Sequence, residues 1–270
     1  MSSTSRNQLS INRVHFSYEG GEEILKGISL ELDHRPTAII GQNGAGKTTF
    51  VKLLKGLLIP TKGCILWNGE DITKYSVAML AKEIGLVFQN PNDQIFKNTV
   101  IDEVMFGPLQ IGMTKVEAEK LATDALEMVD LLEEKETNPY DLGLSERKLI
   151  SIASVIAMNT KVIIFDEPTI AQDYRGKELI KKLILRLREE GKMVISILHD
   201  MDFVAETFER VIVFASGQVL LDGTGKEIFG KKSMLEDVSL EQPHITRLGN
   251  ELGCEEIFLN VEDFVTYKKL

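Results

Sequence analysis

Cysteine is scarce in this 270-residue chain, which contains only Cys64 and Cys254. The two thiols lie far apart in the sequence, and neither belongs to a Cys-x-x-Cys pair. This spacing gives no sign of a disulfide framework. We expect both cysteines to be reduced and buried, as in a protein of the cytoplasm.

Long apolar runs are also missing, because no stretch reaches the roughly 18 residues that a membrane-spanning helix needs. The polar N-terminal residues 1–10 lack the apolar centre of a secretory signal. We therefore expect the protein to stay in the cytoplasm and to reach a membrane only through partners.

Positively charged residues are also fewer than negatively charged ones. Lysine and arginine number 31 against 41 aspartates and glutamates, so the net charge is −10. Non-specific binding to nucleic acid depends on basic patches, so we expect no nucleic-acid partner. The hydrophobic content of 43% supplies one sizeable core with room for a small appendage.

What is present is a set of short apolar segments that alternate with helical patterns. The runs at 36–40, 161–165 and 193–198 are typical of strands that are buried on both faces of a sheet. A helix is predicted at 175–190, where Gly191 stops it, and a block of helices at 99–158. Strand–loop–helix units of this kind indicate an open α/β sheet, with the helical block as an inserted lobe.

A glycine-rich loop follows the strand at 36–40 and matches the phosphate-binding pattern Gly-x-x-x-x-Gly-Lys-Thr in full. Its glycines let successive main-chain N–H groups face the phosphate oxygens, and the next helix adds the positive end of its dipole. Lys47 supplies a cation for the β- and γ-phosphates, and the Thr48 hydroxyl suits Mg²⁺. The alternative is a tight turn, which this complete match disfavours. The residues expected to bind ATP in this loop are Gly41, Asn43, Gly44, Ala45, Gly46, Lys47, Thr48 and Thr49.

A second acidic motif ends the apolar strand at 162–165, where Asp166 and Glu167 follow directly. Such a strand brings Asp166 to the edge of the sheet beside the phosphate loop, where it can hold Mg²⁺ through water. Glu167 can then polarise the attacking water. A solvated strand end is the plainer interpretation of this motif, but the upstream phosphate loop favours the catalytic one.

These motifs resemble the ATP-binding cassette (ABC) family over nearly all of the chain up to about residue 230. Asp166-Glu167-Pro168-Thr169 is similar to its Walker B segment. The resemblance implies that Gln89 contacts Mg²⁺ and a transmembrane partner, and that His199 contacts the γ-phosphate. It thus implies catalytic roles for Glu167, His199, Lys47 and Gln89, and Mg²⁺ ligation by Thr48, Gln89 and Asp166.

Two further positions are similar to elements of the same family. Asp173 is similar to the D-loop aspartate, and Tyr18 stands where the family stacks an aromatic ring on adenine. Either residue taken alone is more often structural, but order and spacing favour the functional interpretation of the whole set. The implied fold is a P-loop ABC ATPase, with a RecA-like α/β core, an antiparallel β subdomain and a helical subdomain at about 90–160. The ATPase domain would span 1–230, and 231–270 would form a small C-terminal extension.

A closer resemblance is to the energy-coupling-factor (ECF) importers and the cobalt and nickel transporters. It rests on the segment 89–96, on Phe106-Gly107-Pro108 and on the length of a single cassette with a short tail. The resemblance implies an ATP-hydrolysing subunit that energises uptake of vitamins or transition-metal ions from the cytoplasmic face of the membrane. Its partners would be a second ABC ATPase, a transmembrane coupling protein and a substrate-binding membrane protein.

The sequence departs from the family at the signature Leu-Ser-Gly-Gly-Gln, which caps the ATP of the other subunit in a head-to-tail dimer. An ungapped alignment of both flanks places Leu142, Gly143, Leu144, Ser145 and Glu146 on this motif. The serine hydroxyl is then lost, and two glycines gain side chains. Alternatively, Leu144-Ser145 is the true Leu-Ser pair, with two residues missing after it. The ungapped alignment predicts one impaired composite site and a heterodimer with a similar ATPase.

Three rival functions remain open. The first is a soluble ABC ATPase that acts outside transport, for example on DNA, ribosomes or iron–sulfur assembly. The second is a regulatory cassette of low activity, which the degenerate signature favours and Glu167 and His199 disfavour. The third is a small-molecule kinase with the same phosphate loop, which leaves the segments around Gln89 and His199 unexplained.

Overall fold

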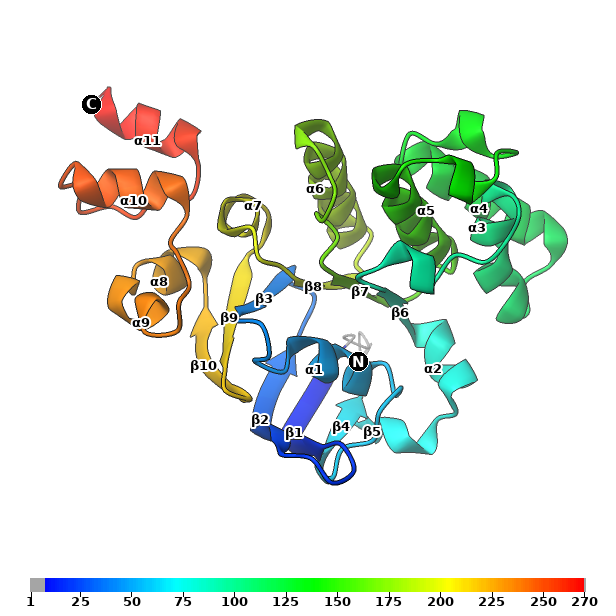
Figure 1. Cartoon of the computed structure of the whole chain (residues 1–270), viewed down its shortest axis with the longest axis horizontal. Coiled ribbons are helices and arrows are strands. Elements are labelled where there is room, and N and C mark those ends of the chain that lie inside the picture. The colour runs from blue at the N-terminus through cyan, green and yellow to red at the C-terminus, as the bar shows by residue number, and fades with distance from the viewer. Residues whose placement is uncertain (1–7, 270) are drawn as a thin grey trace, which may run out of the picture.

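A computed structural model describes residues 8–269 of the chain. Residues 1–7 and 270 lie outside the described part, and with them most of the polar N-terminal segment. Two sheets lie one above the other, and helices cover the outer face of the larger one (Figure 1). Short 3-10 helices lie at Ile72–Lys74, Pro91–Asp93, Leu132–Glu134 and Pro139–Asp141.

The smaller sheet is antiparallel and has the strand order β2-β1-β4-β5. Its strands are β1 (Leu9–Ser17), β2 (Glu23–Leu32), β4 (Lys62–Trp67) and β5 (Glu70–Asp71). The antiparallel subdomain expected from the family resemblance is confirmed. β2 begins five residues before the expected start at Ile28, because Ser17 pairs with Glu23 and the hairpin sets the start of the strand.

The larger sheet has the order β10-β9-β3-β8-β7-β6 and is parallel except for the hairpin strand β10. All residues of β3, β6, β7 and β8 are buried. The continuous apolar runs predicted this for β3, β7 and β8, whereas β6 was not expected from the sequence. The strands are β3 (Thr37–Gly41), β6 (Ile84–Val87), β7 (Val162–Asp166), β8 (Met193–Ile197), β9 (Arg210–Ala215) and β10 (Gln218–Gly223).

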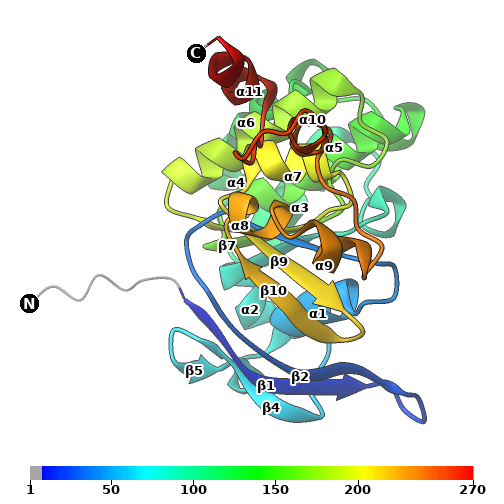
Figure 2. The ribbon, with the colours of Figure 1, turned by 90° about the vertical axis from the view of Figure 1, so that its left-hand side faces the viewer.

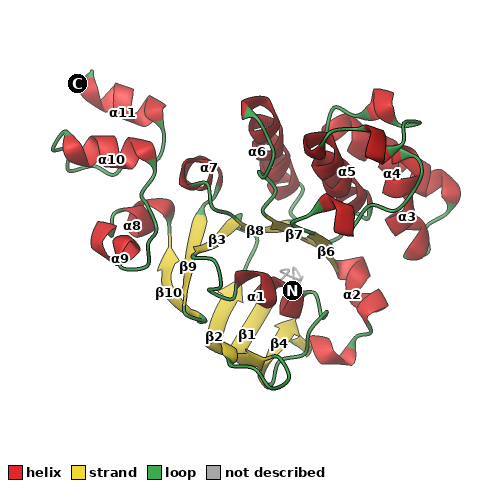
Figure 3. Ribbon diagram, in the orientation of Figure 1, coloured by secondary structure: helices red, strands yellow, loops and turns green. Residues whose placement is uncertain are grey.

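The alternation of side chains along each central strand feeds two separate cores. In β3, Ile40 belongs to the core beneath the outer helices, whereas Ile39 faces the core between the two sheets. Helix α1 (Lys47–Leu54) lies between the sheets and buries Phe50 and Leu54 there (Figure 3). The N-terminus of α1 is thereby fixed at the end of β3.

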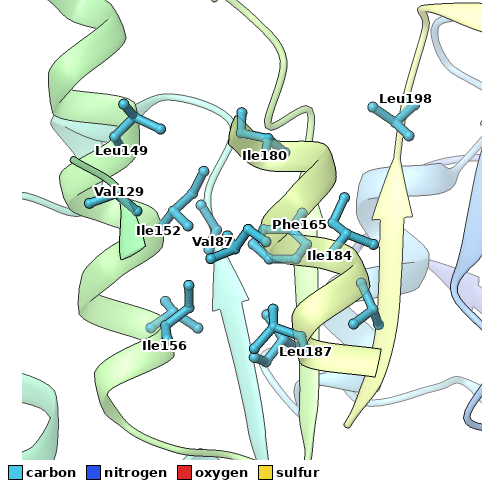
Figure 4. Close-up of a cluster of buried hydrophobic side chains, with 14 of the residues drawn as sticks. Val87, Val129, Leu149, Ile152, Ile156, Phe165, Ile180, Ile184, Leu187 and Leu198 are labelled. Atoms are coloured by element: carbon cyan, nitrogen blue, oxygen red, sulfur yellow. The ribbon is translucent and has the colours of Figure 1, made fainter. Parts of the chain in front are cut away.

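The inserted lobe consists of α3 (Val100–Gln110), α4 (Lys115–Met128) and α5 (Leu144–Ala157), which pack on one another. Ile152 of α5 and Ile184 of α6 (Tyr174–Glu189) gather with Val87 and Phe165 of the parallel sheet in one buried cluster (Figure 4). The lobe is therefore anchored to β7, which ends in the acidic motif, and to β6, which precedes Gln89. Helix α2 (Val77–Glu83) lies at the outer edge of the sheet beside β6.

The C-terminal region consists of short helices joined by loops, with no strand after the β9–β10 hairpin in its described part. It continues from α7 and the β9–β10 hairpin to the end of the chain (Figure 2). Its half-exposed Cys254, and the half-buried Cys64 of β4, are free thiols, so the expectation that both cysteines are buried is wrong. Among residues 8–269, no helix is long and apolar enough to cross a bilayer. The helices are α7 (Met201–Thr207), α8 (Gly225–Phe229), α9 (Lys232–Glu236), α10 (His244–Glu251) and α11 (Val261–Lys268).

Candidate active site

The predicted site residues meet at one edge of the larger sheet, where its parallel strands end. The phosphate loop follows β3, Gln89 follows β6, Asp166 ends β7 and His199 follows β8. Ligands of open α/β proteins bind outside the carboxyl ends of the strands. The strand order therefore brings together four segments that are distant in the sequence.

The phosphate loop has the backbone that its glycines predicted. Gly46 takes φ 97°, and a Cβ there would lie 2.6 Å from the Leu25 side chain, so the position requires glycine. Lys47 turns back over the loop, where its Nζ donates to the main-chain oxygens of Gly41 at 2.7 Å and Gln42 at 2.9 Å. Burial lowers the pKa of Lys47, while Glu167 and Asp166 oppose the shift. The Lys47 ammonium group is thus partly desolvated and lies over the phosphate loop.

The rest of the loop lines a hollow of about 210 Å³. Asn43, Gly44 and Ala45 border it, and Asp237 and Val238 from the C-terminal region close its far side. Thr48 and Thr49 lie in the first turn of α1, where main-chain N–H groups have no partner within the helix. A phosphate group at this helix end would meet both the free N–H groups and the dipole.

Asp166 has the environment of a metal ligand. Asp166 is 4% exposed, and its Oδ1 has no hydrogen-bond partner. Burial, and then the neighbouring Glu167, raise the pKa of Asp166, and the nearby Thr48 side chain opposes the rise. A buried carboxylate oxygen without a partner is costly, and a divalent cation would satisfy it. Asp166 and Thr48 therefore fit Mg²⁺.

Glu167 and His199 form a close pair. Oε1 of Glu167 lies 3.1 Å from Nε2 of His199. Glu167 takes φ 50°, a left-handed conformation, and its N–H donates to the main-chain oxygen of Ile197 at 3.1 Å. Both side chains line a cavity of about 300 Å³ with Lys177, which is bound to Asp200 at 2.6 Å. The pair can orient a water molecule and accept its proton.

Three predicted residues lie at the margin of this arrangement. Gln89 is exposed directly after the Phe88 that follows β6. Tyr18 follows β1, is 46% exposed and packs edge-on to Phe16. Asp173 accepts a hydrogen bond from Gly176 N at 2.8 Å and so caps α6. Asp173 therefore has a structural role, which is the more common one for such a residue taken alone.

The degenerate signature begins α5. Gly143 is the N-cap residue and provides no side-chain cap, while its N–H donates to Oε2 of Glu146 at 2.6 Å. The Ser145 hydroxyl donates to Oε1 of Gln172 at 2.9 Å, within the same chain. Helix α5 begins at Leu144, within the segment that both alignments place on the signature. If Ser145 were the signature serine of the gapped alignment, its hydroxyl would be occupied inside the chain.

An apolar groove of about 340 Å³ runs between α2, the segment after β6 and the lobe. Phe88, Phe96, Phe106 and Met158 are among its lining residues. Phe96 is 56% exposed and packs edge-on against Phe106. The segment from Gln89 to Phe96 thus joins the acidic site to an exposed apolar surface.

Two side chains at the site were not identified as site residues from the sequence. Lys148 is 1% exposed in α5, and its Nζ donates to three main-chain oxygens of the site. Gln172 forms two hydrogen bonds with Ser145. The signal for Lys148 is its helical spacing from Ile152 and Val155, which places a cation on the buried face of α5. Gln172 gave no such signal, because its partner lies 27 residues away.

Comparison with known proteins decides the family. The family model described as "ABC transporter" matches residues 25–170, more than half of the chain. The chain belongs to the ABC transporter family. It is an ATP-hydrolysing cassette, and its P-loop fold and the expected ABC ATPase architecture are confirmed.

One curated relative is the energy-coupling factor transporter ATP-binding protein EcfA of Methanocaldococcus jannaschii. The two are 37% identical over 238 residues, which are 87% of this chain and 85% of the relative. Three other relatives are longer, and this ABC cassette spans 45%, 40% and 42% of their lengths.

Two solved structures show the same fold. CbiO1 from Clostridium perfringens, described as part of the ABC transporter complex cbiONQ, superposes with a TM-score of 0.77. It is 32% identical, and the match covers 92% of this chain and 99% of cbiO1. The cassette MJ0796, a dimer bound to ADP and Pi, gives a TM-score of 0.74 at 27% identity, with coverage of 80% and 98%.

Proposed function

We propose that this ABC ATPase energises an ECF-type membrane importer, for vitamins or transition-metal ions, from the cytoplasmic face of the cell membrane. The apolar groove beside Gln89 carries the proposal. Exposed apolar surface rimmed by polar residues marks a site of protein contact, and this groove lies beside the segment that carries Gln89. The relatives named for ECF and cbiONQ complexes support the same assignment.

The groove suits a helix with one apolar face. Leu86, Phe88 and Phe106 provide apolar walls, and Lys55 and Glu103 line it as polar groups. A helix-in-groove contact of this kind buries apolar anchors at helical spacing. We assign the groove to a transmembrane coupling protein, which would in turn hold a substrate-binding membrane protein.

Affinity purification from native membranes tests this assignment. The wild-type chain should recover both membrane proteins, and Phe96→Asp should recover at least about tenfold less, because a charge would enter the apolar contact. Val116→Asp is the matched control, since Val116 is 79% exposed on α4 and outside the groove. Recovery of ribosomes or nucleic-acid complexes in place of membrane proteins would favour the soluble rival.

The chemistry follows from the close groups. The Glu167 carboxylate accepts a proton from the attacking water, and His199 holds that carboxylate and reaches the transferred phosphoryl group. Lys47 offsets negative charge on the β- and γ-phosphates. Thr48 and Asp166 would hold Mg²⁺ with Gln89, and the ion supplies further charge neutralisation. Tyr18 would stack on adenine, and Asp173 would act in the D-loop.

We propose in addition that the working unit is a heterodimer with a second, similar ABC ATPase. Gly143 offers no hydroxyl, and Ser145 is bonded to Gln172. A lost hydrogen bond to a charged phosphate costs about 1.5–3 kcal/mol. A partner with an intact signature would close over the phosphate loop of this chain, whereas the reverse site would be impaired.

Gel filtration of Glu167→Gln with Mg-ATP tests the heterodimer. The variant alone should remain monomeric, and it should dimerise after addition of the second ATPase. A tight homodimer would contradict the proposal. If the heterodimer keeps full ATPase activity after inactivation of this chain's own Glu167, the regulatory rival gains support.

The chain would divide accordingly. The ATPase domain would take residues 1–230 with its lobe at about 90–160, and the extension would take 231–270. His244 N donates to Oδ1 of Asp202 at 2.7 Å, so the extension is bound to the helix that follows His199.

A further inference from the structure

Lys148 occupies an unusual position for a lysine. Its side chain is fully buried in the first half of α5, at 1% exposure. Its Nζ donates to the main-chain oxygens of Phe88 at 2.8 Å, Gln89 at 3.0 Å and Asp166 at 3.0 Å. An ammonium group has three N–H donors, so all three are used. Burial lowers the pKa of Lys148 to about 8.

The three acceptors lie where the pairing of β6 with β7 ends. β6 and β7 pair residue by residue from Ile84↔Val162 to Val87↔Phe165, and the recorded pairing ends there. Phe88 and Gln89 follow Val87, and Asp166 follows Phe165. Lys148 therefore continues the cross-link between the strands for one step beyond the ladder, at the point where the site begins.

The segment after β6 is bound to α5 at other points as well. Arg147 Nη1 donates to Oδ1 of Asn92 at 2.9 Å, and Gln94 Nε2 donates to the Ser151 oxygen at 2.9 Å. A shift of α5 must therefore carry this segment with it. Among these contacts, Lys148 alone also reaches the oxygen of Asp166.

An isolated buried ammonium is expensive, and an apolar side chain would pack α5 against the sheet without that cost. The advantage of a lysine at this position must therefore come from the main-chain oxygens to which its ammonium group is hydrogen-bonded. We propose that Lys148 is a positioning residue, which fixes the main chain of Gln89 and Asp166 so that their side chains converge on Mg²⁺-bound nucleotide. It acts through these two residues and contacts no substrate atom.

This inference rests on the proposed roles of Asp166 and Gln89. The test must therefore distinguish a failure of the inference about Lys148 from a failure of those proposed roles. The readout is binding of a fluorescent ATP analogue to the full chain, titrated with Mg²⁺. Lys148→Met should raise the half-saturating Mg²⁺ concentration by about tenfold, as is usual for residues that support metal ligands. Binding without Mg²⁺ should remain within about twofold of wild type.

Lys148→Gln keeps neutral donors and should give an intermediate value. If Lys148→Met does not fold, Lys148→Gln decides the question alone. Lys192→Met is the matched control, because Lys192 is a partly buried lysine that donates to the Thr160 oxygen at 2.9 Å, away from the site. Its Mg²⁺ dependence should equal that of wild type.

Asp166→Asn separates the two possible failures. If Asp166→Asn leaves the Mg²⁺ dependence unchanged, the proposed metal role of Asp166 is wrong. If Asp166→Asn shifts the dependence while both Lys148 variants behave like Lys192→Met, the inference about Lys148 is overturned.

Discussion

Ser145 and Gln172 clasp each other by two reciprocal hydrogen bonds. The Ser145 hydroxyl donates to Oε1 of Gln172 at 2.9 Å, and Nε2 of Gln172 donates to the main-chain oxygen of Ser145 at 3.1 Å. Gln172 is 9% exposed and immediately precedes Asp173. The start of α5 is thereby bound to the segment that leads into α6. The hydroxyl of Ser145 is engaged in a hydrogen bond within its own chain.

Restoration of the signature should create a homodimer. We expect the triple change Gly143→Ser, Leu144→Gly and Ser145→Gly, in a Glu167→Gln background, to strengthen self-association in Mg-ATP by about 10²- to 10⁴-fold. The reason is one recovered charged hydrogen bond at each of the two composite sites, each worth about 1.5–3 kcal/mol. A Cβ at Gly143 meets only Oε2 of Glu146, at 3.1 Å, and that side chain is flexible.

Analytical ultracentrifugation gives the measurement for this restoration. The control adds Lys47→Ala, which should abolish the gain, because the dimer forms around ATP. An unchanged monomer in the restored chain would show that the signature is not what prevents homodimers.

Loss of the Glu167 carboxylate should stop turnover and spare binding. Glu167→Gln should lower kcat by about 10²- to 10⁴-fold, the range for a general base. Phosphate release in the full complex and filter binding of ATP measure the two effects. Glu189→Gln, at the exposed end of α6, should leave both at wild-type values. Near-normal ATPase activity in Glu167→Gln would refute the role of Glu167.

Lys55 should make stability depend on pH. Burial lowers the pKa of Lys55 to about 8 from 10.5, so the folded state disfavours the charged form. Stability should rise as the pH increases above about 8, because the folded protein releases this proton before the unfolded chain does. Relative to Lys55→Met, wild type should gain about 2 kcal/mol between pH 7 and 9.5. Urea unfolding at both pH values measures this, and a constant difference would contradict it.

His244 should stabilise the docking of the C-terminal extension at low pH. Asp202 raises the pKa of His244 through a hydrogen bond and charge attraction. A raised histidine pKa gives stability that is complete below the unfolded value near 6.5 and disappears as the pH rises through the folded value. The fall in melting temperature caused by His244→Ala should therefore be larger at pH 6 than at pH 8.5. His34→Ala is the control, and equal falls for His244→Ala at both pH values would count against this contact.

The sequence by itself determined the phosphate loop, the buried strands and the acidic pair that ends β7. Each is a contiguous pattern, in which neighbouring residues set strand, turn and helix start through local conformation and burial. Thus residues 161–165 predicted β7 to within one residue, and Gly41 to Thr48 predicted the loop before α1. The family resemblance added the antiparallel sheet and the helical lobe.

Only the tertiary structure decided which distant groups meet. Glu167 and His199 are close because β7 and β8 are neighbours in the sheet, and strand order leaves no trace in local periodicity. The burial of Lys148 depends in the same way on where α5 crosses the ends of β6 and β7. The local sequence of a segment specifies its own secondary structure. These contacts instead depend on how the segments pack against one another, which the burial of the whole hydrophobic core determines.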